Sequence, residues 1–398
     1  MLLTEGSPMN KRSVRDLDVG GKRVLVRVDF NVPVKDGEVT DDTRIRRALP
    51  TIRYLLSEGA RPVLISHLGR PKGGPDPRYA MDPVAERLEE LLGEPVEKLD
   101  AAVGPEVEEA LDGRDGRGVV LLENSRFYPG EPENDPGLAD QLADLADLYV
   151  DDAFGAAHRA HATTVGVAER LPAAAGLLLE EEIDYLDTVL EAPERPFVAI
   201  LGGAKVSDKL GVIESLLGTA DSLLVGGAMC FTFFKALGHE IGDSLVEDNY
   251  LEEAKRLMDE AGERLVLPVD VVVADTMEEG ADSETVPVDG IPSGKMGLDI
   301  GPETVDLFGG HISGASTVFW NGPMGVFEID AFAKGTEGVA RAVADSGATS
   351  VVGGGDSVAA VNKLGLEDEM SHISTGGGAS LEYVEGKELP GVAVLPDK

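Results

Sequence analysis

The stretch at residues 197–210, FVAILGGAKVSDKL, constrains the fold more than any other part of the 398-residue chain. Its apolar run stops at Gly202 and Gly203, and apolar residues then recur at helical spacing from Val206. This pattern is typical of a strand, a glycine turn and the start of a helix. Such a turn leaves unpaired backbone N–H groups at the helix N-terminus, where an anion can bind.

Two lysines follow the turn. Lys205 and Lys209 are four residues apart, so on a helix that starts here they share one face. The N-terminal end of a helix already carries positive partial charge, and cations are normally placed at the other end. The pair is therefore unfavourable unless an anionic ligand offsets it. The alternative is two solvated lysines on an exposed turn, and this stretch alone leaves that alternative open.

The chain is longer than one hydrophobic core normally supports, so we expect two domains. Short apolar runs alternate with helical segments throughout, at 23–28, 62–65, 119–122, 148–150, 223–225, 269–273, 317–320 and 350–352. This alternation predicts an α/β fold of two doubly wound, Rossmann-like parallel-sheet domains. Residues 1–178 are expected to form the first domain. A helix with three glutamates at its head, at 179–193, is expected to be the hinge, and the second domain follows from 194.

The net charge of the chain is −38, from 73 acidic and 35 basic residues. This balance argues against a nucleic-acid partner, because such binding depends on cationic contacts to phosphates. At about 1 M salt the Debye length falls to about 3 Å, and surface charges no longer repel one another. We therefore interpret the charge as an adaptation to a salt-rich cytoplasm. The competing hypothesis is an acidic docking surface for a basic partner.

The adaptation hypothesis gives a first prediction. Dialysis from molar KCl into dilute buffer is expected to reduce helical circular dichroism, because self-repulsion then acts unscreened on the folded state. Full helicity in dilute buffer would instead favour the docking surface.

Cysteine content and hydropathy limit the location of the chain. Its one cysteine, Cys230, excludes an internal disulfide and a multi-cysteine metal site, which indicates a reducing, cytoplasmic setting. There is no run of about 18 apolar residues and no charged-then-apolar leader, so we expect neither a membrane span nor a secretory signal.

Arginine is concentrated in the first half, where 17 of the 21 arginines precede residue 179. The planar guanidinium group binds carboxylate and phosphate oxygens in pairs. Four apolar runs there are each followed closely by an arginine or by polar residues, at 29–31, 66–70, 123–126 and 151–161. Ligands of open α/β sheets gather outside such strand ends. The first half is thus predicted to hold a small, multiply charged anion, although Arg46, Arg47 and Arg53 are better explained as solvated helix residues.

Two loops of the second half carry further candidate groups. In WNGPMGVFE, at 320–328, Asn321 and Glu328 are suited to a ribose or a purine edge. In GGGDS, at 353–357, the glycines let backbone N–H groups approach a phosphate, and Asp356 with Ser357 offers oxygen ligands suited to Mg²⁺. A structural turn explains three glycines equally well. Together with the turn at Gly202, however, the loop predicts a nucleotide-phosphate site.

Six motifs, taken in order, resemble phosphoglycerate kinase over nearly the whole chain. They are RVDFNVP (27–33), SHLGRP (66–71), DDAFGAAHRAH (151–161), LGGAKVSDK (201–209), WNGPMGVFE (320–328) and GGGDS (353–357). The resemblance implies reversible phosphoryl transfer from 1,3-bisphosphoglycerate to MgADP, giving 3-phosphoglycerate and MgATP in glycolysis and gluconeogenesis. It implies a cytoplasmic monomer, a phosphotransferase with a carboxyl acceptor. It further implies a triose-binding first domain, a nucleotide-binding second domain ending at 379, and a tail at 380–398 that returns to the first domain.

The resemblance also implies the site residues. The triose would be bound by Asp29, Phe30, Asn31, Arg44, His67, Leu68, Gly69, Arg70, Arg126 and Arg159. The nucleotide would be bound by Gly202, Gly203, Lys205, Lys209, Asn321, Glu328, Gly353, Gly354, Gly355, Asp356 and Ser357. Asp356 would bind Mg²⁺ together with the nucleotide phosphates. The family usually has threonine at the position of Ser357, which puts the packing there in doubt.

Phosphoryl transfer needs two positioned substrates and neutralised charge, and no nucleophilic side chain. Because the acyl phosphate hydrolyses readily, hinge closure that excludes water is expected to precede transfer. Arg44, Lys205 and Lys209 would then converge on the migrating phosphoryl group as the catalytic residues.

Three other functions are weighed against this one. A nicotinamide-dependent dehydrogenase should show G-x-G-x-x-G, and a P-loop ATPase G-x-x-x-x-G-K-[ST], and we find neither convincingly. A non-catalytic acidic nucleotide-binding module explains the charge but leaves the arginines at the strand ends without a purpose.

Overall fold

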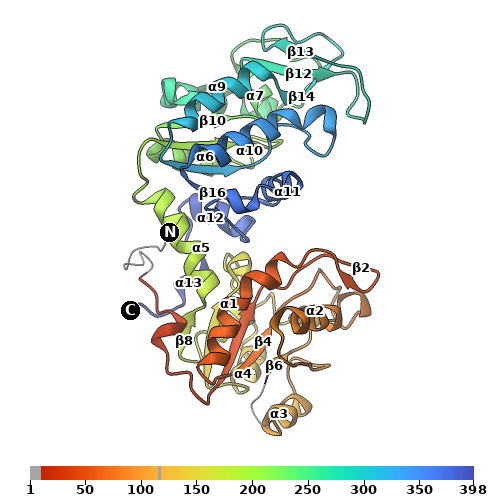
Figure 1. Cartoon of the computed structure of the whole chain (residues 1–398), viewed down its shortest axis with the longest axis vertical. Coiled ribbons are helices and arrows are strands. Elements are labelled where there is room, and N and C mark those ends of the chain that lie inside the picture. Colours follow the sequence, from red (N-terminus) through yellow and green to blue (C-terminus); the bar gives the residue numbers. More distant parts are fainter. Residues whose placement is uncertain (1–9, 115–117) are drawn as a thin grey trace. The chain divides into compact units, whose positions relative to one another are not determined.

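The computed structural model describes residues 10–114 and 118–398. The chain forms two compact units (Figure 1). The first contains the chain up to Asp184 together with Glu388–Lys398, and the second contains Tyr185–Lys387. Among the described residues no helix is both long and apolar enough to cross a membrane.

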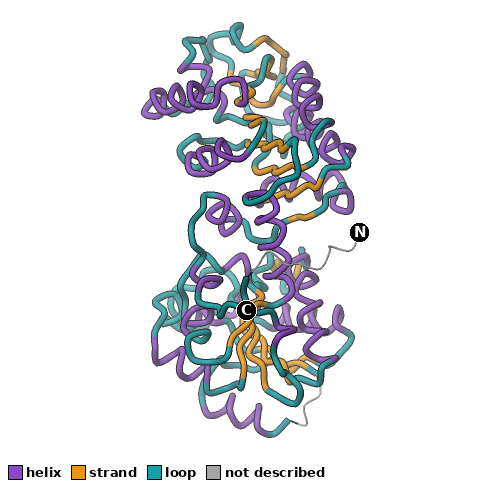
Figure 2. Tube along the Cα trace, turned by 90° about the vertical axis from the view of Figure 1, so that its left-hand side faces the viewer, coloured by secondary structure: helices purple, strands orange, loops and turns teal. Residues whose placement is uncertain are grey.

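The first unit is built on a six-stranded parallel sheet in the order β5-β6-β4-β1-β7-β8. Its strands are β1 (Arg23–Val28), β4 (Arg61–Ile65), β5 (Val96–Lys98), β6 (Val119–Leu121), β7 (Leu148–Asp152) and β8 (Ala173–Ala175). Its longer helices are α1 (Thr43–Ser57), α2 (Asp82–Leu92), α3 (Pro105–Asp112) and α4 (Pro136–Ala143), and β2 (Val34–Lys35) pairs with β3 (Glu38–Val39) in a small hairpin. Helices flank the strands of this sheet on both sides (Figure 2).

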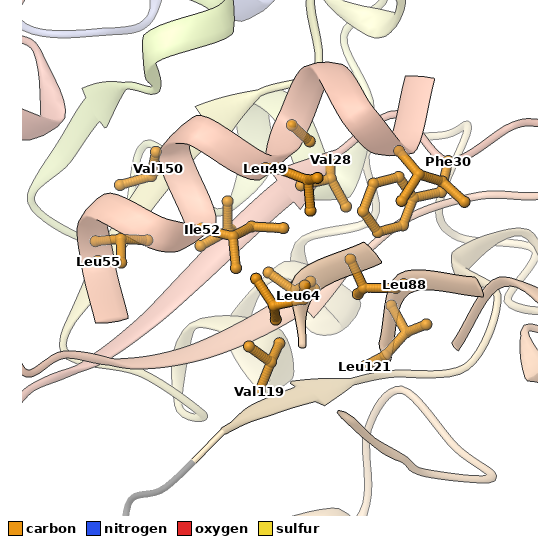
Figure 3. Close-up of a cluster of buried hydrophobic side chains, with 14 of the residues drawn as sticks. Val28, Phe30, Leu49, Ile52, Leu55, Leu64, Leu88, Val119, Leu121 and Val150 are labelled. Atoms are coloured by element: carbon orange, nitrogen blue, oxygen red, sulfur yellow. The ribbon is translucent and has the colours of Figure 1, made fainter. Parts of the chain in front are cut away.

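The core of the first unit explains why α1 lies against the sheet. Leu49, Ile52 and Leu55 recur at three-residue spacing on α1 and are buried, and they pack near Val28 and Leu64 of the central strands (Figure 3). Parallel strands covered on both faces are apolar almost throughout, as β1 is. Arg27 of β1 is an exception, because its side chain is charged and yet buried.

The second unit has its own six-stranded parallel sheet in the order β11-β10-β9-β15-β16-β17. Its strands are β9 (Phe197–Leu201), β10 (Ser222–Val225), β11 (Leu265–Val266), β15 (Thr317–Asn321), β16 (Thr349–Gly353) and β17 (His372–Ile373). Its helices include α6 (Leu210–Thr219), α7 (Cys230–Ala236), α8 (Leu251–Ala261), α9 (Pro302–Ser313), α10 (Lys334–Ser346), α11 (Gly355–Leu364) and α12 (Gly378–Val384).

One predicted strand belongs to a different sheet. The run at 269–273 forms β12 (Asp270–Ala274), which pairs antiparallel with β13 (Ser283–Pro287) and β14 (Met296–Ile300). Its apolar sequence resembles that of a buried parallel strand. The mostly exposed partner β13 carries polar residues that gave no strand signal, so the sequence did not reveal the antiparallel pairing.

Helix α5 (Leu177–Leu190) contains the division between the units, and its two ends have different partners. In the first unit, Asp152 Oδ1 accepts hydrogen bonds from the backbone N–H groups of Leu178 and Leu179 at 2.9 and 3.3 Å. In the second unit, the Tyr383 hydroxyl donates to Asp187 at 2.5 Å. Each end is therefore held by side chains of its own unit. The hinge role of residues 179–193 stays a prediction.

The last residues of the chain pack within the first unit. Helix α13 (Pro390–Ala393) begins beside the loop after β7, where Gly391 N–H donates to Ala157 O at 2.8 Å. Lys11 Nζ donates to Leu395 O at 2.8 Å and pairs with Asp397 at 2.9 Å. These bonds hold the two ends of the described chain together within the same unit.

Candidate active site

The loops after β1, β4, β6 and β7 leave the same edge of the first sheet, because these strands are parallel neighbours. Hydrogen bonds join the loops to one another. Phe30 N–H donates to Ser66 Oγ and Gly69 N–H to Asn31 Oδ1, both at 2.8 Å. Arg126 Nη1 donates to Gly69 O at 2.9 Å. The predicted residues at 29–31, 66–70 and 126 are thus brought together, and we call this cluster with Arg44 and Arg159 the arginine site.

Phe30 and Leu68, which the resemblance placed in the site, have side chains buried in the core. Their backbone groups are hydrogen-bonded within the protein, so these two residues hold the loops of the site from the core. Asn124 was not singled out from the sequence, but it holds the loop at 66–70. Its Oδ1 accepts from Leu68 N–H at 3.2 Å and its Nδ2 donates to Leu68 O at 2.8 Å. A position three residues after a strand gives no signal of this role.

The cations of the arginine site are mostly without acidic partners. Arg44 pairs with Asp29, with 2.9 Å between Nη1 and Oδ2, and also donates to Asn31 O. In the described part of the chain, no ion pair involves Arg70, Arg126 or Arg159. Burial, together with the charges of Arg159 and Arg27, lowers the pKa of Arg126. This uncompensated positive charge makes the cluster a site for an anion.

Two histidines lie at the arginine site and both are held neutral. Burial and the neighbouring arginines place the pKa of His67 well below its usual value. For the same reasons the pKa of His161 falls to about 4. His161 was noticed in the sequence only as a neighbour of Arg159. Neutral imidazoles can orient a ligand here without adding to the repulsion among the guanidinium groups.

In the second unit, the loops after β9, β15 and β16 meet at one edge of the sheet. Gly202 N–H donates to Asn321 O at 2.9 Å, and Gly322 N–H donates to Ser357 Oγ at 2.6 Å. They surround a cavity of about 370 Å³, the glycine cavity, whose lining includes Gly202, Gly203, Lys205, Lys209, Asn321, Gly354, Gly355, Asp356 and Ser357. Gly353 ends β16 and is not in that lining.

The two lysines reach the glycine cavity, but not from a helix. Helix α6 begins at Leu210, with Lys209 as its N-cap residue, so the predicted shared helical face is wrong. The preceding segment is drawn away from the helix by Ser207, which donates its N–H and hydroxyl to Glu247 at 3.0 and 2.6 Å. Lys209 Nζ donates to Asn321 Oδ1, whereas Lys205 is exposed.

Burial lowers the pKa of Lys209 to about 8. An anionic ligand would restore the charged form, so affinity for MgADP is expected to fall as the pH rises above about 8, by up to about tenfold per pH unit. The depressed pKa also means that the unfolded chain binds more protons here, so this group's contribution to stability rises between about pH 8 and the ordinary lysine value of 10.5. Calorimetric titrations at several pH values test the first effect. Lys209→Met should remove the pH dependence, and the exposed Lys205→Met should leave it in place.

The protein donors near the glycine cavity fit a magnesium ion only in part. Asp356 lies exposed in the first turn of α11 and lines the cavity. In the part of the chain that the structure describes, no group of three or more His, Cys, Asp or Glu could hold a metal. Ser357 is buried, and its hydroxyl holds the loop at Gly322. Mg²⁺ keeps several non-protein ligands, so Asp356 fits an ion that phosphate oxygens also hold.

A second cavity, of about 490 Å³, shares Gly203, Ala204, Pro323 and Asp356 with the glycine cavity, and we call it the apolar cavity. Its other lining includes Phe231, Leu245, Met277, Met296, Met324, Asp243, Asp299 and Glu328. Of these only Glu328 was predicted. Met324 lies in the same 320–328 motif but was not singled out. The others come from α7, the antiparallel sheet and the loops between them, which no linear motif connects. An apolar cavity that continues into a glycine-lined one suits a nucleoside attached to phosphates.

Two α/β units, one with an anion site of arginines and one with joined apolar and glycine-lined cavities, define a two-domain phosphotransferase of the kinase type. The family model "Phosphoglycerate kinase" matches residues 14–387. The chain is 80% identical over 390 residues to a phosphoglycerate kinase of Rubrobacter xylanophilus, covering 98% of this chain and 99% of that one. It is 56% identical to the enzyme of Thermosipho africanus, with coverage of 98% and 99%.

Solved structures agree. The phosphoglycerate kinase of Coxiella burnetii superposes with a TM-score of 0.87 at 43% identity, covering 96% of this chain and 98% of that one. That of Pyrococcus horikoshii gives 0.83 at 34% identity, with the same coverage. The chain therefore belongs to the phosphoglycerate kinase family.

Proposed function

We propose that the chain catalyses reversible phosphoryl transfer between 1,3-bisphosphoglycerate and MgADP, giving 3-phosphoglycerate and MgATP. The observation that carries the proposal is the pair of anion sites with different chemistry. The arginine site suits a small acid with several charges, because its guanidinium groups bind carboxylate and phosphate oxygens in pairs. The joined cavities suit a purine nucleotide, because apolar walls lead to glycine N–H groups and lysines.

In the arginine site, Arg70, Arg126 and Arg159 would bind the phosphate that is not transferred. Asp29, Asn31 and His67 would orient the glycerate by hydrogen bonds. Gly69 would lie beside it, and Phe30 and Leu68 would support the site from the core. Arg44 would lie nearest the reacting carboxyl group, where the Asp29 carboxylate holds its guanidinium in place. A held donor stabilises developing charge without reorganising during the reaction.

In the second unit, Gly354 and Gly355 would present backbone N–H groups to the nucleotide phosphates, and Asp356 would bind Mg²⁺ with them. Gly202 and Gly203 would bind the nucleotide as the close-packed wall of the same cavity, because their own N–H groups donate to Asn321 O and Pro323 O. The ion would supply charge neutralisation between the phosphates. Lys205 is exposed and without an ion pair among the described residues, so it is free to follow the transferring group. Lys209 and Asn321 would act together, because they already share a hydrogen bond.

The mechanism follows from the chemistry of the transfer. The phosphoryl group passes between two oxygens in line, through a loose transition state whose charge lies on its equatorial oxygens. The protein therefore supplies position and positive charge, from Arg44 on one unit and the two lysines on the other. Since the substrates would be bound by separate units, we further propose that closure about the α5 segment brings them together and excludes water. We infer a monomer, since one chain carries both sites, and a cytoplasmic location, since a single cysteine is typical of a reducing setting.

A coupled assay of ATP formation tests this proposal, using 1,3-bisphosphoglycerate and ADP at low and at molar KCl. Magnesium-dependent ATP formation is expected. An acidic nucleotide-binding module would bind MgADP in calorimetry but form no ATP at either salt concentration, and that result would replace the proposal with the alternative.

A further inference from the structure

A chain of four buried polar side chains lies beneath the arginine site. The exposed fractions are 0% for Glu131 and Thr163, 1% for Arg27 and 7% for His67. Strand β1 carries Arg27, the loop after β4 carries His67, and the wide helical turn at Ala162–Gly166 carries Thr163. Buried ionised groups are costly unless each is paired by hydrogen bonds. The donor and the acceptor of each hydrogen bond among these four side chains therefore determine where the protons lie.

The first bonds fix the hydroxyl of Thr163. Its backbone N–H donates to Glu131 Oε2 at 3.0 Å, and its Oγ1 lies 2.5 Å from Glu131 Oε1. A carboxylate only accepts, so the Thr163 hydroxyl proton points to Glu131. The lone pairs of Oγ1 are then left to accept from Arg27 Nε at 2.9 Å. Arg27 also donates from Nη1 to Val28 O, so its guanidinium is fixed on two sides.

The remaining guanidinium nitrogen reaches His67, with Arg27 Nη2 3.0 Å from His67 Nδ1. Arginine has only donors and keeps its charge, so Nδ1 must accept and cannot carry a proton. Burial and the facing charges of Arg27, Arg126, Arg44 and His161 also keep the pKa of His67 well below its usual value. A neutral imidazole with a bare Nδ1 carries its proton on Nε2.

His67 Nε2 remains available for a ligand. Nε2 makes no hydrogen bond to any described residue. It is also not one of the fully buried polar atoms that lack a hydrogen-bond partner. His67 shares its loop with Arg70, and Asn31 holds the same loop at Gly69. The charges of Arg126, Arg44 and His161 act on the same ring, so we assign the unused N–H to the arginine site.

We propose that Arg27 is a positioning residue: by donating to Nδ1 it fixes His67 in the Nε2–H tautomer, so that His67 donates a hydrogen bond to an oxygen of the bound acid. The identity of that oxygen, on the carboxyl or hydroxyl of the glycerate, rests on the proposed function. The tautomer does not, because it follows from Arg27 and the buried chain behind it.

The test uses the full chain with ¹⁵N-labelled histidine and long-range ¹H–¹⁵N correlation spectra, with His67 assigned from its loss in His67→Gln. The wild type is expected to show the Nε2–H pattern without titration between about pH 5 and 8. Arg27→Met should give mixed tautomers or a titrating His67. It should also raise the KM for 3-phosphoglycerate tenfold or more, with a smaller change in kcat. Thr163→Val should change the tautomer pattern of His67 in the same way, but to a smaller extent.

Thr51→Val is the matched control. Thr51 is equally buried in the first unit, and its hydroxyl accepts from Leu177 N–H at 2.9 Å, away from this chain of bonds. The His67 signals should be unchanged in that variant. An Nδ1–H pattern in the wild type, ordinary titration of His67, or an unchanged His67 in folded Arg27→Met would overturn the proposal. If Arg27→Met does not fold, the His67 spectra of the wild type and of Thr163→Val still test the proposal. Failure of the ATP assay alone would leave the tautomer assignment standing.

Discussion

Replacing Arg44 by alanine is expected to lower kcat about 10²-fold or more, the effect of losing one preorganised charge-stabilising donor. Only Nη1 of this guanidinium is used by Asp29 and Asn31 O. The rest of the group is free to face the reacting phosphoryl. Alanine would also leave the Asp29 carboxylate unpaired beside an anionic substrate. Steady-state kinetics in both directions measure the loss, and affinity for MgADP should change little because the proposed nucleotide site lies in the second unit.

Arg46→Ala is the matched control for this variant. Arg46 lies two residues further along α1, is exposed and pairs with Asp42 at 2.7 Å. Such surface pairs contribute little to stability, so turnover and unfolding temperature should both stay near the wild type. Unchanged turnover in Arg44→Ala would remove Arg44 from the mechanism. A similar loss of turnover in both variants would mean that it comes from a disturbed helix α1 and not from the missing guanidinium group of Arg44.

Replacing Gly202 by alanine is expected to weaken nucleotide binding strongly. An added Cβ would lie 2.1 Å from Pro323 O and 2.7 Å from Gly322 O. Neither carbonyl can withdraw easily, because Pro323 O accepts from Gly203 N–H at 3.2 Å and Gly322 O accepts from Trp320 Nε1 at 2.8 Å. Overpacking of this kind typically costs about 1–3 kcal/mol, sometimes more. We expect about 3 kcal/mol of lost stability and at least about 10²-fold weaker MgADP binding, measured by thermal unfolding and calorimetry.

Gly218→Ala gives the contrasting result within the same βα unit. Gly218 lies exposed in α6, and no atom beyond its helix neighbours is within 4 Å of an added Cβ. Alanine is the better helix former by about 0.5–1 kcal/mol, so this variant should be slightly more stable and bind MgADP normally. If Gly202→Ala also binds normally, then the close approach of the two loops does not shape the phosphate site.

The fold class could be predicted because buried parallel strands are apolar along their whole length, and the glycine turns mark where those strands end. The prediction is confirmed for both six-stranded sheets. It failed for β12, whose apolar sequence resembles that of a parallel strand although its partners are antiparallel. The wrong start of α6 has a similar cause, because the Ser207–Glu247 bonds that delay the helix join residues 40 apart.

The site residues that the sequence indicated are those within strand-end motifs, such as Asn31, His67 and Lys209. The structure places them in the arginine site and the glycine cavity, and their roles stay predictions. The residues that sequence reasoning missed act from a distance. Thr163 reaches the site through Arg27, and Glu131 does so through Thr163 and through His161, whose Nδ1 lies 3.7 Å from Glu131 Oε1. Most of the apolar cavity is assembled from segments without a shared motif. Their signal lies in packing and hydrogen bonding, which sequence spacing does not contain.

The central claim is that the acid and the nucleotide bind separate units. Hydrogen–deuterium exchange of the full chain, measured with 3-phosphoglycerate alone and with MgADP alone, tests it most directly. We expect 3-phosphoglycerate to slow exchange at 29–31, 66–70 and 158–161, and MgADP to slow it at 202–209, 321–328 and 353–357. Protection by MgADP at the arginine site, or by 3-phosphoglycerate at the glycine turns only, would contradict the assignment.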